Sequence, residues 1–455
     1  MIGIILIIYG LILAGIGLYS AFKIKTPEDY YIAGKKNGYW QITGSLLASI
    51  LGGSAILGTA NLAVTESWAA AWYLLAAAIG FLALIPVVGK VSLLGKYTLT
   101  NLIGRFYGKT AQQSAGVIIP LAWTGIVAAQ VIAASKILHS LFQLSYPVGV
   151  IFAGAIFIGY TLVGGQISIL KTDFFQALVI LTGIVVTALF LAHQQEHQHV
   201  MQAFRSNFPF NSHFKSLDLL ILLLTYSTTF VVGPDVYSRV FCARDARTAR
   251  KSVLLAAIVL IPFAFVLTYV GVFAQTTIAA EHLKNSVALI DLIHRYLPQW
   301  VTGLMAAALL SAVLSSADTT LLTASMMLAE LVHPKMDNLK SLTITRYFIV
   351  LTGLISIFIA LKFTSIVGTL LMALSFYSGA FIIPVLAALT NIRVNLKMSI
   401  PAMLTGGLVA LSGKIISQYT TLNIGNWMII AAFIFNFILL KIPAGSKKIT
   451  NQQVQ

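Results

Sequence analysis

LLSAVLSSADTTLLT, residues 309–323, combines the apolar composition of a membrane helix with an unusual number of hydroxyl side chains. The surrounding run, 301–332, holds two formal charges, Asp318 and Glu330. Its central hydroxyl groups belong to Ser311, Ser315, Ser316, Thr319, Thr320 and Thr323. Because polar oxygens in hydrocarbon need partners, we expect this helix to face other helices rather than lipid.

Ala312, Ser315 and Ser316 stand at helical spacing i, i+3 and i+4, which places one carbonyl and two hydroxyls on one face. Oxygen ligands without formal charge suit a weakly held hard cation. The alternative is a packing role, in which small hydroxyl residues let helices approach and bond carbonyls one turn back.

The composition indicates an all-α polytopic membrane protein. The chain has 455 residues, of which 58% are hydrophobic and 9% charged, and its mean hydropathy is +0.91. Its single cysteine, Cys242, excludes an internal disulfide and a cysteine metal cluster. Hydropathy predicts about 13 transmembrane helices, near 2–20, 40–63, 68–89, 113–138, 147–163, 173–193, 218–238, 253–275, 299–331, 342–363, 366–390, 398–417 and 425–441.

The distribution of basic residues predicts the orientation. With the N-terminus outside, all but seven of the 29 lysines and arginines fall on the cytoplasmic side; the exceptions are Lys136, Arg205, Lys215, Lys284, Arg295, Lys362 and Lys414. We therefore expect a multi-pass protein of the cell membrane with an outside N-terminus and a cytoplasmic C-terminus. The same distribution explains the net charge of +16 and argues against nucleic acid as a partner.

Two predicted spans carry signs of interruption. Gly52, Gly53 and Ser54 fall in the middle of the second, and the seventh contains Gly233 and Pro234, where proline ends the hydrogen-bond ladder. Unwound backbone at membrane depth requires protein or a water-filled cavity around it. Glycines also serve as ordinary packing contacts, which is the alternative.

The spacing of the interruptions predicts internal symmetry. They lie five spans apart, so their helices run in opposite directions, as two inverted five-helix repeats with discontinuous first and sixth core helices require. The prediction is a single transporter domain over 1–455: an extra N-terminal helix (2–20), repeat 1 (40–193), repeat 2 (218–390) and two extra C-terminal helices (398–441).

The first interruption supplies a partner for the hydroxyl face. If the second span unwinds near 52–55, the carbonyls of Ala48 and Leu51 lose their helical donors. Together with Ala312, Ser315 and Ser316 they would make five uncharged oxygens from two facing helices. Such a set should bind a cation weakly and reversibly, as a coupling ion requires.

These stretches resemble the sodium/solute symporter family, which includes sodium-coupled sugar, proline and pantothenate carriers. The resemblance covers most of the chain and is carried by DYYIAGKKNGYW (29–40), SLLASILGGSAILGTA (45–60), TLTNLIGRFYG (98–108), YTLVGGQISILKTDFFQ (160–176), GPDVYSRVFCARDARTARKS (233–252) and SAVLSSADTTLLTAS (311–325). It implies two inverted five-helix repeats, with one extra helix before them and two after.

The resemblance also implies roles for particular residues. The family's sodium ligands fall on the carbonyls of Ala48, Leu51 and Ala312 and on the hydroxyls of Ser315 and Ser316. The family's aspartate at the start of its fifth core helix falls on Asp173, where it would help the ion leave towards the cytoplasm.

The chain also departs from the family pattern. Asn101 and Glu330 stand where relatives have a carboxylate and an aspartate. Residues 52–55 lack the polar side chains that sugar carriers use, which favours a small acid or amino acid over a sugar.

Three acidic residues have competing interpretations. Asp173 could instead be a carboxylate that stabilises a helix start. Asp318 could bind a second cation, take a proton, or accept hydrogen bonds from neighbours such as Thr319. Asp235 and Arg239, at i and i+4, are interpreted as a structural bridge.

Substrate contacts are expected at the two interruptions. The candidates are Gly52, Gly53, Ser54, Gln130, Tyr226, Thr228, Thr229 and Phe230, with Trp72 and Trp123 as weaker aromatic candidates. Helix N-termini at a break present free N–H groups, which favours a carboxylate-bearing solute.

The expected function is a sodium-coupled symporter that imports a small organic solute by alternating access, with no enzyme activity. The solute would be an amino acid or a monocarboxylate. The expected partners are this solute, sodium as the coupling ion and membrane lipid, with no other cofactor and no obligate protein partner. The alternatives are proton coupling through Asp318 and a membrane sensor built on a transporter scaffold.

Overall fold

The computed structural model describes residues 1–94, 96–277, 289, 292, 295–390, 392–420 and 424–442. Over these residues the fold is helical, with an isolated bridge between Asn37 and Ala243. Ten helical segments in this part are long and apolar enough to cross a membrane, and a shorter apolar helix follows them. The prediction of an all-helical membrane protein is therefore confirmed.

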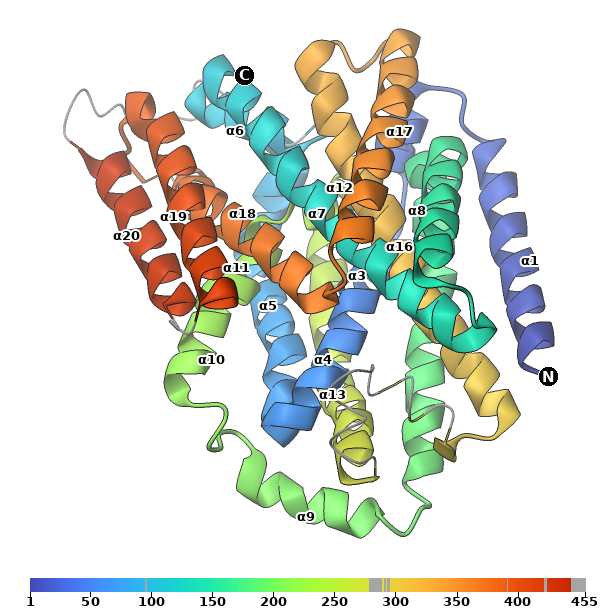
Figure 1. Cartoon of the computed structure of the whole chain (residues 1–455). Helices are drawn as coiled ribbons and strands as arrows, with labels where there is room; N and C mark the ends of the chain where they lie inside the picture. Colours follow the sequence, from blue (N-terminus) through green and yellow to red (C-terminus); the bar gives the residue numbers. More distant parts are fainter. Residues whose placement is uncertain are drawn as a thin grey trace.

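The helices pack side by side as a bundle, with α9 lying across one end of it (Figure 1). Their bounds are α1 (Ile2–Ala21), α2 (Pro27–Ile32), α3 (Tyr39–Ile50), α4 (Gly53–Glu66), α5 (Trp72–Leu94), α6 (Leu99–Tyr107), α7 (Lys109–Phe142), α8 (Tyr146–Leu191), α9 (His197–Asn207), α10 (Ser216–Leu222), α11 (Thr228–Val232), α12 (Pro234–Cys242), α13 (Ala246–Thr277), α16 (Gln299–Val332), α17 (Leu339–Lys362), α18 (Ile366–Leu389), α19 (Ser399–Tyr419) and α20 (Gly425–Lys441).

The count of thirteen separate spans is not reproduced. The predicted spans 147–163 and 173–193 are two helices that follow each other without a loop in α8, a stretch of 46 residues with a sharp kink. The bend is at Gly165, whose φ of 51° lies in the left-handed region that glycine adopts without strain. An added Cβ there would lie 2.6 Å from the Tyr30 ring, so the bend also needs a residue without a side chain.

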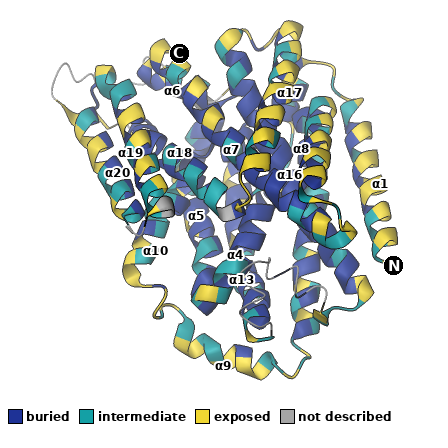
Figure 2. Cartoon of the chain, in the orientation of Figure 1, coloured by how far each residue is buried: buried dark blue, intermediate teal, exposed yellow. Residues whose placement is uncertain are grey.

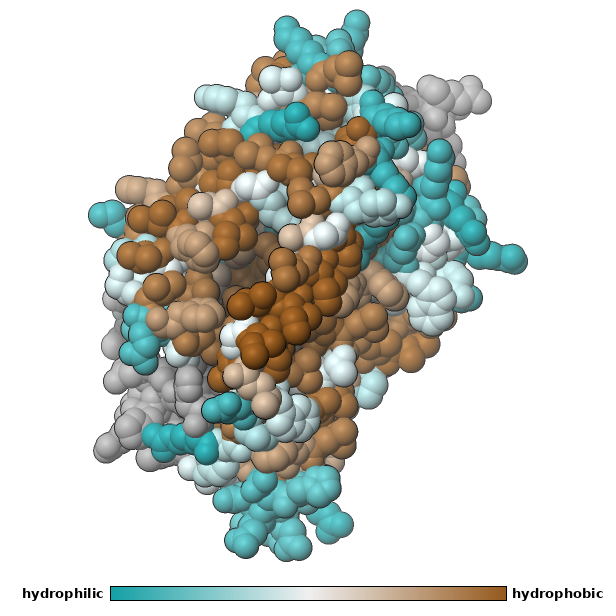
Figure 3. Space-filling view, turned by 90° about the vertical axis from the view of Figure 1, so that its right-hand side faces the viewer, coloured by the Kyte–Doolittle hydropathy of each residue, from teal (hydrophilic) through white to brown (hydrophobic). Residues whose placement is uncertain are grey.

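The centre of the bundle is built on α16, which packs against α7 and α8 (Figure 1). The hydroxyl residues of 309–323 are all buried, as expected for a helix that faces protein. At the edge of the bundle, α1 exposes most of its apolar surface (Figure 2). A broad hydrophobic band crosses the middle of the molecule between hydrophilic ends (Figure 3), which matches the hydrocarbon layer of a bilayer.

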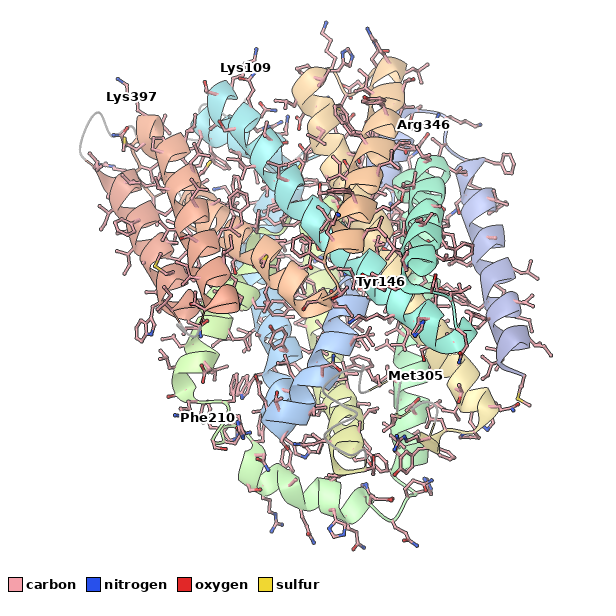
Figure 4. The ribbon with its side chains drawn as sticks, viewed as in Figure 1. Lys109, Tyr146, Phe210, Met305, Arg346 and Lys397 are labelled. Carbon is pink, nitrogen blue, oxygen red and sulfur yellow. The ribbon has the colours of Figure 1, made fainter. Side chains whose placement is uncertain are left out.

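A buried carboxylate ties one end of α16 to its neighbours. Glu330 accepts hydrogen bonds from Thr98, Thr100, Asn101 and Gln112, which lie on or next to α6 and α7. The two positions that depart from the family pattern, 101 and 330, are therefore in contact. Lys109 and Lys397 lie at this end of the bundle, and Phe210 lies towards the other (Figure 4).

Candidate functional site

The second predicted span is broken in the middle, between α3 and α4. Helical geometry stops at Leu51, and Gly52 is extended, with φ −66° and ψ 166°. The unwound part is shorter than the expected 52–55 because the helix restarts at Gly53; the N–H groups of Ala55 and Ile56 both donate to the carbonyl of Gly52. The predicted interruption is confirmed, with its position moved towards the N-terminus.

The break lies directly against the hydroxyl face of α16. The Ser315 hydroxyl donates to the Ala48 carbonyl at 2.9 Å and lies 3.2 Å from the carbonyl oxygen of Ala312. The Ser316 hydroxyl donates to the Ser49 carbonyl at 2.8 Å. Four oxygens of the predicted cation set, on Ala48, Ala312, Ser315 and Ser316, thus lie together between two helices.

Glycine is required at the break because the two helices approach so closely. A Cβ added to Gly52 would lie 2.2 Å from the Ser316 hydroxyl oxygen, and one added to Gly53 would lie 2.2 Å from Val313. Both glycines therefore act as contact points with α16.

Two details of the oxygen set differ from the expectation. Leu51 is the C-cap of α3, and its N–H donates to the Leu47 carbonyl, but no hydrogen bond joins it to α16 within the described part of the chain. The carbonyl of Ser49, which was not predicted, takes the Ser316 hydroxyl instead. A break frees several successive carbonyls, and the sequence does not determine which of them faces a given hydroxyl.

The seventh predicted span is interrupted as well. After a π-helical turn (Leu223–Ser227) and α11, Gly233 is extended, with φ −68° and ψ 128°, and Pro234 begins α12. Two tyrosines satisfy carbonyls that lose helical donors here: Tyr237 donates to Val231 at 2.8 Å, and Tyr377 donates to Val232 at 2.5 Å. Discontinuity of both spans is confirmed.

Beneath the α3–α4 break lies a buried ion pair. The guanidinium of Arg239 on α12 lies 3.1 Å from the carboxylate of Asp173 on α8, and both side chains are fully buried. Arg239 also donates to the carbonyl and hydroxyl of Ser45 and to the Thr319 hydroxyl. It therefore joins α3, α8, α12 and α16.

The interpretation of Asp235 and Arg239 as a structural bridge is wrong. Arg239 donates to the main-chain carbonyl of Asp235 at 3.0 Å, and its ion-pair partner is Asp173. At the i, i+4 spacing, Arg239 therefore contacts the main chain of Asp235, whereas its charge pairs with a carboxylate on another helix, α8.

Asp318 lies in the same buried region. One of its carboxylate oxygens is 3.4 Å from the Thr319 hydroxyl, which is a long hydrogen bond, and the other has no partner within the described part of the chain. Asp173 likewise has one oxygen without a partner there. The guanidinium of Arg239 pairs with Asp173 and makes no ion pair with Asp318 among the described residues, so the charge of Asp318 could be balanced by a further cation or a proton.

A cavity of about 70 Å³ lies between the two breaks. It is lined by Ser49, Ile50, Ser54, Ala55, Trp123, Ile126, Gln130, Tyr226, Thr229, Phe230, Asp235, Ser316, Thr320, Leu370 and Leu374. Five substrate candidates are therefore brought together: Ser54, Gln130, Tyr226, Thr229 and Phe230. Trp123 joins them, and Gln130 donates to the Ser54 hydroxyl at 2.9 Å.

The other candidates lie elsewhere. Gly52 and Gly53 contact α16, and Thr228 donates back to the Leu224 carbonyl within its own helical segment. Trp72 donates to the carbonyl of Pro209 and stacks on Phe208. Asp235 is a lining residue that sequence reasoning missed, because its spacing to Arg239 suggested a local pair.

A larger cavity of about 280 Å³ adjoins this one. It is lined by residues that include Glu66, Asp218 and Lys414, and it shares Tyr226 and Leu374 with the smaller cavity. We call the larger cavity the vestibule. Its lining includes Asp218, Ile221 and Leu222 of α10.

Solved structures share this fold. A Na⁺-coupled sialic acid symporter in a substrate-bound outward-open state matches with a TM-score of 0.79 at 18% identity, covering 98% of this chain and 99% of that one. A nucleobase-cation-symport-1 family transporter in a closed conformation matches with a TM-score of 0.59 at 14% identity, covering 93% and 97%. A manganese transporter from Eremococcus coleocola matches with a TM-score of 0.56 at 14% identity, covering 89% and 94%. At these identities the likeness establishes the fold.

A family model covers most of the chain. The model described as "Sodium:solute symporter family" matches residues 30–406, which include both helix breaks, the hydroxyl face of α16 and the lining of the cavity. The chain belongs to the sodium:solute symporter family.

Proposed function

We propose that this protein imports a small organic solute together with sodium, and that sodium binds between the α3–α4 break and α16. The observation that carries the proposal is the contact of the Ser315 hydroxyl with the carbonyl of Ala48. Because these two oxygens, one from a side chain and one from the main chain next to the break, are 2.9 Å apart, a single ion could contact both. Ala312, Ser316 and, through its carbonyl at the end of α3, Leu51 complete the proposed set.

The solute would bind in the cavity between the two breaks, next to the cation. Ser316 belongs to both sites, and Ser49, whose carbonyl accepts its hydroxyl, lines the cavity, so an occupant of one site alters the surroundings of the other. Such contact is the physical basis for coupling, since each ligand favours the conformation that the other also binds. The vestibule gives outside access if the N-terminus is outside and the C-terminus cytoplasmic. The two halves, 40–193 and 218–390, would rock as inverted repeats around this point.

Asp173 and Asp318 would serve the cation on its way to the cytoplasm. Each has one oxygen without a partner among the described residues, and Asp173 alone pairs with Arg239. They could therefore stage the departing ion or hold a second one. The free oxygen of Asp318 also makes proton coupling the second candidate function.

Uptake into proteoliposomes tests these alternatives. A panel of amino acids, monocarboxylates and vitamins is screened for solutes that accumulate when a sodium gradient is imposed. Full accumulation without sodium, driven by a pH gradient, would favour the proton alternative. Sodium and solute binding without accumulation would favour a sensor.

Asp173→Asn is expected to slow transport more than binding. The amide keeps the size and a hydrogen bond to Ser45 but removes the charge that would attract the leaving ion. We expect the maximal uptake rate to fall by about tenfold or more, with a smaller change in the sodium concentration for half-maximal uptake. Asp337→Asn is the matched control, because that carboxylate pairs with Lys96 at an exposed position. An unchanged rate would leave Asp173 a purely structural role.

A further inference from the structure

We infer that the transported solute carries a protonated amino group and that Asp235 binds it. The inference rests on the proposed function and names the chemical class of the solute: an amino acid or related amine rather than a simple monocarboxylate. Asp235 supplies the negative charge, and its neighbours in the cavity supply further acceptors.

Asp235 lies where a charge is costly unless something pairs with it. It is in the first turn of α12 and lines the cavity between the breaks. An acidic residue favours a helix start, but this start lies at the centre of a membrane bundle rather than in water. The cation one turn away is committed elsewhere, since Arg239 pairs with Asp173. Asp235 takes part in none of the ion pairs found among the described residues.

Two neighbouring groups in the cavity lack partners. The side-chain oxygen of Gln130, a residue 2% exposed, has no hydrogen-bond partner within the described part of the chain, and neither does the indole N–H of Trp123, which is 1% exposed. Buried polar atoms without hydrogen-bond partners are rare in protein cores because they destabilise the fold. Here they line a cavity with Asp235, so a bound solute can satisfy them. An ammonium group offers three donors to the Gln130 and Asp235 oxygens.

The charge balance of the cavity argues against a solute that is only anionic. None of the lining residues that the structure describes is basic, and the single carboxylate among them is that of Asp235. A monocarboxylate would leave Asp235 unpaired and place a second negative charge beside it. A zwitterion avoids both costs.

The N-terminus of α4 provides a place for the carboxylate of such a zwitterion. This helix starts at Gly53 without a side-chain cap, and Ser54 and Ala55 of its first turn line the cavity. Its first N–H groups and its dipole favour a negative group, and the proposed sodium site at Ser316 is adjacent. The ammonium would then point towards Asp235 on the opposite break.

The vestibule has a matching electrostatic character. Its lining includes two carboxylates, Glu66 and Asp218, and one lysine, Lys414, beside His213. With two carboxylates against one lysine, this approach disfavours a solute that is only anionic.

Matched solutes and one isosteric variant test the inference. Purified full-length protein in sodium chloride is titrated with the proteinogenic amino acids and with matched acids that lack the amino group. Examples of such pairs are alanine and propionate, leucine and 4-methylpentanoate, and proline and cyclopentanecarboxylate. The corresponding amines, which lack the carboxylate, are titrated as well. Thermal stabilisation is measured for wild type, Asp235→Asn and the exposed control Asp337→Asn. Sodium alone is titrated separately.

We expect at least one amino-bearing solute to bind, and its deaminated acid to bind at least about tenfold more weakly. Asp235→Asn should weaken binding of that solute by at least about tenfold while its response to sodium alone stays at the wild-type value. Tighter binding of deaminated acids, no response to any amino-bearing solute, or unchanged affinity in Asp235→Asn would overturn the inference. If the variant does not fold, the wild-type comparison of matched solutes decides. If sodium alone does not stabilise the wild-type protein, that result would instead contradict the proposed function.

Discussion

Replacing Ser315 and Ser316 together by alanine is expected to raise the sodium concentration for half-maximal uptake by about tenfold or more. Each hydroxyl supplies a proposed ligand oxygen, and each loss should cost about 1 kcal/mol, so two account for at least a tenfold change. The measurement is the initial rate of solute uptake into proteoliposomes as a function of sodium concentration.

The matched control for this change is Ser325→Ala. Ser325 is buried on the same helix, but its hydroxyl donates at 2.7 Å to the Leu321 carbonyl within α16 and lies away from the α3–α4 break. It should leave the sodium dependence unchanged. An unaltered sodium dependence in the double variant would count heavily against the proposed ion site.

The second large effect concerns stability. Arg239→Ala is expected to lower the free energy of unfolding by about 3–5 kcal/mol, because it leaves the carboxylate of Asp173 buried without its cation. It also removes the hydrogen bonds to Ser45 and Thr319. The midpoint of thermal or denaturant-induced unfolding in detergent measures this loss.

A double variant isolates the electrostatic part. Adding Asp173→Asn to Arg239→Ala removes the uncompensated charge and should restore part of the lost stability. Arg244→Ala is the matched control, since its pair with Asp245 is exposed and worth little. Equal stability of the single and double variants would show that the charge of Asp173 is not what Arg239 compensates.

The sequence predicts the proposed ion site because two local patterns point to the same place. Glycines at 52 and 53 marked where one helix ends, and hydroxyls at 315 and 316 marked the face of another. Both features follow from the residue types alone. Because they lie in long apolar runs, their polar groups need partners on neighbouring helices. What these signals left open was which released carbonyl meets which hydroxyl, and Ser49 was missed for that reason.

Arg239 and Asp235 show where sequence reasoning fails. Spacing along one helix suggested that the two side chains pair, but Asp173 lies 66 positions away in the chain and holds the guanidinium instead. Tertiary packing therefore selects the carboxylate that is distant in the chain over the one that lies a single helical turn away.

The close fit of α3 against α16 bears on the choice between alkali metals. Hydroxyl and carbonyl oxygens here lie 2.8–2.9 Å apart, and the contact of Gly52 with Ser316 limits how far the helices can rearrange locally. A small ion needs these oxygens to separate slightly, whereas potassium, with its larger radius, would have to force the two backbones further apart. Discrimination between the two metals would then come from the stiffness of a glycine contact rather than from any charged side chain.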